Sequence, residues 1–125
     1  MEYDSKQLSL IVAQAAQHLH AVVSNIATAL LDVGEGNERV LFSNSALRYI
    51  NGHTLTNLAR HYLSHHQSDC PCLYSLNYAD DMFVYFIVLD SRHVFAVIGK
   101  AQDSTRIEEF SQRLGRLLPA SVQPA

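Results

Sequence analysis

The residues best suited to chemistry lie near the middle of the chain, where histidines and cysteines occur close together. His61 and His65 are four residues apart, so they share one face of a helix, and Cys70 and Cys72 follow within reach. Imidazole and thiolate are ligands that zinc and copper take in proteins. However, Pro71 restricts the Cys-x-Cys geometry, and common zinc sites use a longer loop between their ligand pairs. We therefore predict no bound metal or cofactor, and these four residues are the candidates if a metal binds.

The remaining polar residues form no recognisable catalytic pattern. Asp80 and Asp81 are adjacent and suit a turn, while Glu108 and Glu109 suit the first turn of a helix, where the dipole favours negative charge. The Gly34–Gly36 segment lacks the further glycine and the lysine of a phosphate-binding loop, and no serine or cysteine lies in a known nucleophile motif. We predict that the chain is not an enzyme. An active site assembled from residues distant in sequence stays open as an alternative.

The elements that would position these residues follow from hydrophobic periodicity. The clearest are two apolar, β-branched and aromatic runs joined by a tight turn at Ser91 and Arg92, and His93 is interpreted as a turn residue. Asp4 or Ser5 can cap a first helix, and Pro119 is expected to end the last one. The predicted helices are 4–20, 54–65 and 104–118, and the predicted strands are 21–33, 38–44, 72–78, 82–89 and 93–100. Residues 21–33 could instead prolong the first helix, but a hairpin with 38–44 is favoured.

Composition limits the class of protein. The 125 residues allow one domain, predicted at 1–119 with a mobile tail at 120–125. The chain is 48% hydrophobic and only 17% charged, so a partner is expected to cover some apolar surface. Its net charge of -3, without a basic run, disfavours nucleic-acid binding. No stretch is long and apolar enough for membrane insertion, and neither a signal peptide nor a disulfide is indicated, so we expect a cytoplasmic protein.

The predicted order, αββαβββα, makes the chain an α+β protein with a five-stranded antiparallel sheet flanked by helices. With the paired stretches LLDVGEGNERVLFSN and FVYFIVLDSRHVFAVIGK, it resembles the roadblock/LC7 family over residues 4–119. The resemblance implies a non-enzymatic homodimer, formed through a helix and a sheet edge, that serves as a scaffold or regulator. It also implies a protein partner such as a small Ras-like GTPase.

Two further expectations concern binding. Arg48, Tyr49, Arg60 and Tyr62 on the middle helical region are predicted partner contacts, because Tyr and Arg are enriched at binding hot spots, although the tyrosines could instead fill the core. The alternative function is a small-molecule sensor with a PAS- or GAF-like fold, because FSNSALRYING resembles the helix that follows the second PAS strand. A sensor needs a ligand cavity between sheet and helices, whereas a scaffold is packed solid there.

Overall fold

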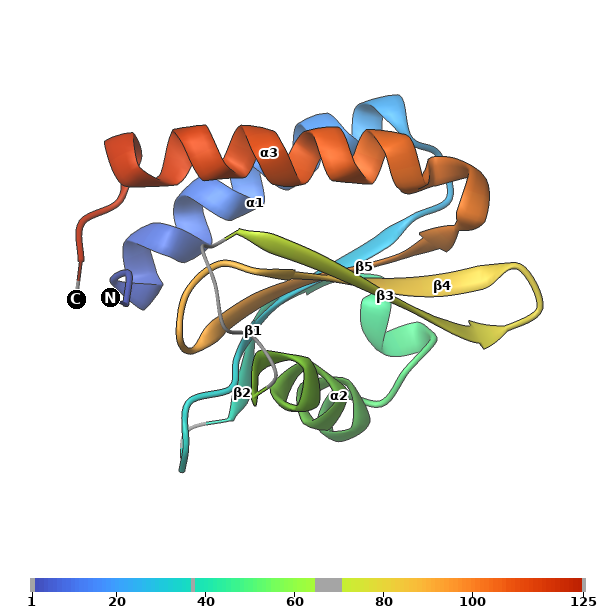
Figure 1. Ribbon diagram of the computed structural model, residues 1–125, viewed down its shortest axis with the longest axis horizontal. Coiled ribbons are helices and arrows are strands. Elements are labelled where there is room, and N and C mark those ends of the chain that lie inside the picture. Colours follow the sequence, from blue (N-terminus) through green and yellow to red (C-terminus); the bar gives the residue numbers. More distant parts are fainter. Residues whose placement is uncertain (1, 37, 65–70, 125) are drawn as a thin grey trace.

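The computed structural model describes residues 2–36, 38–64 and 71–124, and it has three layers: two helices, a sheet, and one helix (Figure 1). The element order αββαβββα is confirmed. In chain order the elements are α1 (Ser5–Val22), β1 (Ala27–Asp32), β2 (Arg39–Asn44), η1 (Ala46–Arg48), α2 (Gly52–Ser64), β3 (Cys72–Ala79), β4 (Met82–Val88), β5 (His93–Lys100), η2 (Ala101–Asp103) and α3 (Ser104–Ser121).

The five strands form one antiparallel sheet in the order β2-β1-β5-β4-β3. The hairpins β1–β2 and β4–β5 are joined through the pairing of β1 with β5, so β2 and β3 are the two edge strands. A β-bulge in the β1–β2 pair places Leu30 opposite Phe42 and Leu31 opposite Val40, which leaves Leu41 as the extra residue. As a result Leu41 and Phe42 both pack against the core on the α1 side of the sheet.

Helices α1 and α3 cover one face of the sheet, and α2 covers the other (Figure 1). Along β5 the side chains alternate between the two cores, as the period of a strand requires: Phe95 points to the α1/α3 side, while Val94 and Ala96 point to the α2 side. Both α1 and α3 have 18 residues, whereas α2 has 13. The α2 face is therefore the less completely covered of the two.

Several boundaries differ from the sequence-based predictions. Helix α1 extends to Val22, so β1 begins at Ala27, later than predicted, after a turn in which Asn25 adopts a positive φ of 61°. Helix α3 passes through Pro119 to Ser121. The prediction that Pro119 ends this helix was wrong. Because a proline has no amide hydrogen, the helix continues through Pro119 without the hydrogen bond to the carbonyl four residues earlier.

The interpretation of His93 as a simple turn residue was also wrong, because its side chain is fully buried. The chain beyond α3 returns to the N-terminus: Val122 is buried, and the amide of Asp4 donates to the carbonyl of Gln123 at 3.0 Å. Tyr3 and Pro124 form an isolated antiparallel bridge. Within the described residues, no helix has the length and apolar character needed to cross a membrane.

Candidate functional site

A partly exposed aromatic surface lies where α2 meets the edge strand β3. Tyr74 of β3 is paired in register with Phe86 of β4, and Tyr62 of α2 lies over both rings. The ring centroids of Tyr62 and Phe86 are 5.2 Å apart in a stacked arrangement, and those of Tyr62 and Tyr74 are 5.4 Å apart. Phe86 is fully buried, whereas Tyr62 and Tyr74 are half-buried, so this aromatic cluster is partly open to solvent.

A second tyrosine pair continues this surface. Tyr49, which follows η1, is 54% exposed, and Leu47 beside it is 46% exposed. Burial, followed by the influence of Tyr49, raises the pKa of Tyr78 on β3 above its ordinary value. The Tyr78 phenol is therefore neutral at physiological pH, and Tyr49 and Tyr78 each present apolar ring area with a polar tip. This combination is common at protein interfaces.

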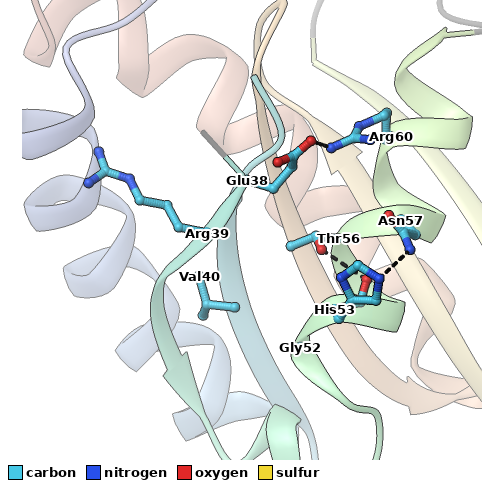
Figure 2. A pocket seen from close by; sticks show the side chains of 8 residues that line it. All are labelled: Glu38, Arg39, Val40, Gly52, His53, Thr56, Asn57 and Arg60. Atoms are coloured by element: carbon cyan, nitrogen blue, oxygen red, sulfur yellow. Dashed lines mark hydrogen bonds and ion pairs between the residues drawn. The ribbon is translucent and has the colours of Figure 1, made fainter. Parts of the chain in front are cut away.

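A polar cleft of about 430 Å³ separates β2 from α2 (Figure 2). Glu38, just before β2, forms an ion pair with Arg60 of α2 across the cleft. On α2, the side-chain amide nitrogen of Asn57 lies 3.2 Å from Nε2 of His53. Glu38 offsets the charge of Arg60, and Arg39 also lines the cleft, so its surface is polar and carries charges of both signs.

The structure places the four predicted partner contacts at different depths. Arg48, the last residue of η1, and Tyr49, just after it, are exposed, and Arg60 is 43% exposed on α2. Tyr62 belongs mainly to the aromatic cluster, so it packs against the α2-side core as well as reaching solvent. The sequence could not separate these roles, because both roles select an aromatic residue on an amphipathic helix.

Two of the four metal candidates can be placed. His61 is near the end of α2, where its ring contacts that of Tyr62, and Cys72 is a free cysteine at the start of β3. His65 and Cys70 lie outside the described residues. In the described part of the chain, no group of three His, Cys, Asp or Glu side chains is arranged to hold a metal ion.

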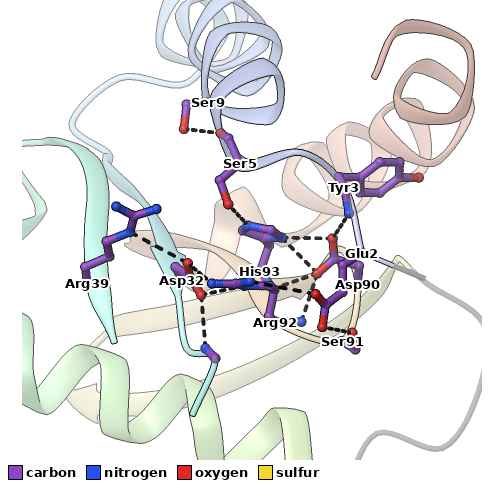
Figure 3. Close-up of polar contacts among 11 residues, drawn as sticks. Glu2, Tyr3, Ser5, Ser9, Asp32, Arg39, Asp90, Ser91, Arg92 and His93 are labelled. Atoms are coloured by element: carbon purple, nitrogen blue, oxygen red, sulfur yellow. Dashed lines mark hydrogen bonds and ion pairs between the residues drawn. The ribbon is translucent and has the colours of Figure 1, made fainter. Parts of the chain in front are cut away.

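A partly buried ion pair that the sequence did not reveal lies where β1 ends (Figure 3). The carboxylate of Asp32, at the end of β1, accepts from Arg92 Nε at 3.0 Å, Arg92 Nη2 at 2.7 Å and the amide of Gly34 at 3.0 Å. Burial alone would raise the pKa of Asp32, but the bonds from Arg92 and Gly34 outweigh it and hold that pKa below its ordinary value. The two partners are 60 positions apart, so no local motif signals the pair.

The fold is similar to that of a solved structure, Myxococcus xanthus MglB, a roadblock/LC7-family protein. The two structures align with a TM-score of 0.54 over 79% of this chain and 80% of that chain, at 17% sequence identity. This likeness confirms the predicted roadblock/LC7-like α+β fold. No family model and no curated protein sequence matches the chain.

Proposed function

We propose that this chain is a dimeric scaffold or regulatory protein that acts by binding another protein. The observation that carries the proposal is the position of β3 as an edge strand of the described sheet, beside the half-buried cluster of Tyr62 and Tyr74. Its roadblock/LC7-like fold supports a scaffold or regulatory role and is compatible with the prediction that the chain is not an enzyme.

The edge strand favours a second copy of the chain as the first partner. β3 has eight residues, and Tyr74, Leu76 and Tyr78 along it are half-buried. A long edge strand of this kind pairs with foreign strands unless it is covered. Antiparallel pairing of β3 with the same strand of another copy would satisfy both edges through one two-fold axis, the commonest symmetry of oligomers. It would also cover the aromatic cluster.

The packing of both sheet faces favours this role over the sensor alternative. Under α3, the rings of Phe95 and Phe110 are 5.6 Å apart, and Leu114 is buried beside them. Under α2, Leu55 is fully buried in the same core as Phe86. Among the described residues, every buried side-chain nitrogen and oxygen atom has a hydrogen-bond partner. A sensor cavity would instead present convergent polar groups awaiting a ligand.

The further partner we propose is a small Ras-like GTPase in the cytoplasm, as the family resemblance implies. Arg48, Tyr49 and Arg60 supply the exposed contacts, and Tyr62 supports them from beneath. Ras-like GTPases from the source genome, loaded with GDP or a GTP analogue, would be titrated against the chain by interferometry. Tyr49→Ala should weaken binding more than tenfold, as hot-spot tyrosines do, whereas Leu10→Ala on the opposite face should not. Equal binding by both variants would contradict this surface.

Dimerisation is tested by sedimentation velocity over a concentration series. The wild type should sediment as a dimer. Ser75→Lys introduces a charge on the exposed side of β3 and should raise the dimer dissociation constant by up to about fivefold, because like charges across a strand pair repel. Ser43→Lys, at an exposed position on the other edge strand β2, is the matched control. A monomeric wild type, or equal effects of both variants, would exclude dimerisation through β3.

A further inference from the structure

Three side chains distant in sequence form a hydrogen-bonded row at the start of α1 (Figure 3). Ser5 Oγ lies 2.7 Å from His93 Nε2, and His93 Nδ1 lies 2.9 Å and 3.0 Å from the two carboxylate oxygens of Asp90. His93 is fully buried and Asp90 is 4% exposed. Serine, histidine and aspartate in this order are the arrangement that activates a serine hydroxyl as a nucleophile.

The hydrogen bonds of Asp90 determine which ring nitrogen of His93 donates to it. The Asp90 carboxylate also accepts from the backbone amides of Tyr3, Arg92 and His93, each at 2.8 Å. Burial would raise the pKa of Asp90, but these bonds and the one from the His93 ring keep it below its ordinary value. An ionised carboxylate only accepts, so Nδ1 of His93 carries a proton and donates to Asp90. His93 Nε2 is then left to accept the proton of Ser5.

The serine opens onto an apolar groove. Ser5 lines a groove of about 700 Å³ between α1 and β2, together with Leu10, Ala13, Leu41 and Phe42. The β-bulge that turns two consecutive β2 side chains to the α1 side creates much of its wall. Leu10 is 64% exposed there, which leaves an apolar surface beside the row. Lys6, Arg39 and Asp4 also line the groove, so its polar rim carries charges of both signs.

Ser5 also occupies a favourable place in the helix. It is the first residue of α1, where Asp4 caps the helix by accepting from the amide of Gln7. The amides of Ser5 and Lys6, in the first turn, have no acceptor within the helix itself. These donors and the positive end of the helix dipole favour negative charge on the carbonyl oxygen of a bound ester, and the neighbouring Asp4 carboxylate opposes it.

We infer that Ser5 is an activated nucleophile that accepts an acyl group from a carboxylic ester whose acyl chain lies in the α1–β2 groove. Ser5 Oγ forms the new bond to the ester carbonyl carbon and passes its proton to His93 Nε2. The bond from that carbon to the alcohol oxygen breaks, and the departing alkoxide takes the proton from His93 and leaves as the alcohol. The product is an acyl ester of Ser5. This site goes beyond the proposed protein-binding function and does not depend on it.

The test uses p-nitrophenyl octanoate and p-nitrophenyl acetate with the full chain, followed by nitrophenol release and by mass spectrometry of the intact protein and its peptides. One octanoyl group should appear on the peptide that contains Ser5. Ser5→Ala should abolish it, whereas Ser104→Ala, at the exposed first residue of α3 and outside the groove, should react within about twofold of wild type. His93→Gln should slow acylation about 100-fold, as loss of a general base does.

Two further measurements test the inference even if His93→Gln fails to fold. Circular dichroism checks each variant, and Leu10→Glu, at an exposed position, should slow the octanoate reaction relative to acetate about tenfold by placing a charge in the groove. A wild type that reacts no faster than the urea-unfolded chain would overturn the inference. Acylation that persists in Ser5→Ala would overturn it too, because the label would then lie on another residue.

Discussion

The buried ion pair gives the sharpest prediction of stability, because its two partners differ in exposure. The Asp32 side chain is 0% exposed, whereas that of Arg92 is 26% exposed. Arg92→Met leaves a buried carboxylate with only the Gly34 amide and Arg39, whose Nε is 3.7 Å away. Asp32→Asn leaves a guanidinium that can turn toward water. Arg92→Met should therefore lower the free energy of unfolding more than Asp32→Asn.

The difference in exposure between Asp32 and Arg92 sets the expected loss of stability for each variant. Removing one partner of a buried pair costs about 3–5 kcal/mol when the other charge stays buried, and Arg39 can approach Asp32, so we expect about 3 kcal/mol for Arg92→Met. For Asp32→Asn we expect about 1–2 kcal/mol, the loss of charged hydrogen bonds without a stranded charge. Arg60→Met, which breaks the exposed pair with Glu38, is the matched control and should cost under about 1 kcal/mol.

Urea unfolding at pH 7 measures all three variants and the wild type. The protein concentration must be the same throughout, because dimerisation adds to the apparent stability. If Arg92→Met costs no more than Asp32→Asn, the buried carboxylate is not the sensitive partner and the reasoning fails. A large effect of Arg60→Met would likewise contradict the argument that exposure decides the cost.

Three further outcomes are expected. Because the pKa values of Asp32 and Asp90 are lowered on folding, both carboxylates stabilise the fold above the unfolded pKa of about 4, and acid titration of urea midpoints should show that stability lost as pH falls through the lower folded values. A flat profile from pH 5 to 2 would contradict this. Phe95→Ala should cost about 3–5 kcal/mol in urea unfolding, since its ring is fully buried between α1 and α3, and a cost under 1 kcal/mol would exclude it from the core. Ser45→Gly should raise the thermal midpoint slightly, because Ser45 has a φ of 66°, and a lowered midpoint would show that its side chain matters more than the backbone strain.

The sequence was sufficient where a pattern is local. The apolar runs of β4 and β5 predicted their strands to within one residue at each end, because both faces of these strands are buried and the turn between them is polar. The start of β1 was predicted too early, since Val22 and Val23 suit a helix end as well as a strand. Asp4 was correctly predicted as a possible cap, because capping depends on residues within one turn.

The row of Ser5, His93 and Asp90 could not be predicted, because it does not follow from a local pattern. Ser5 and His93 are 88 positions apart, and only the order of the strands brings the end of the β4–β5 turn under the first turn of α1. His93 in isolation resembles any polar residue at a hairpin. The aromatic cluster was partly visible, since Tyr62 was among the predicted contacts, but its stacking on Phe86 depends on the placement of α2.

The sheet order also relates the two proposals to each other. β3 and β2 are opposite edges, so a dimer formed through β3 leaves the α1–β2 groove at the outer end of each subunit. Dimerisation through β3 and acylation of Ser5 should then not affect each other. Ser75→Lys, which weakens the dimer, should leave the rate of Ser5 acylation unchanged, and acylation should leave the sedimentation of the wild type unchanged. If dilution to monomer altered the acylation rate, the dimer would have to contact β2, and the assignment of β3 as the shared edge would be wrong.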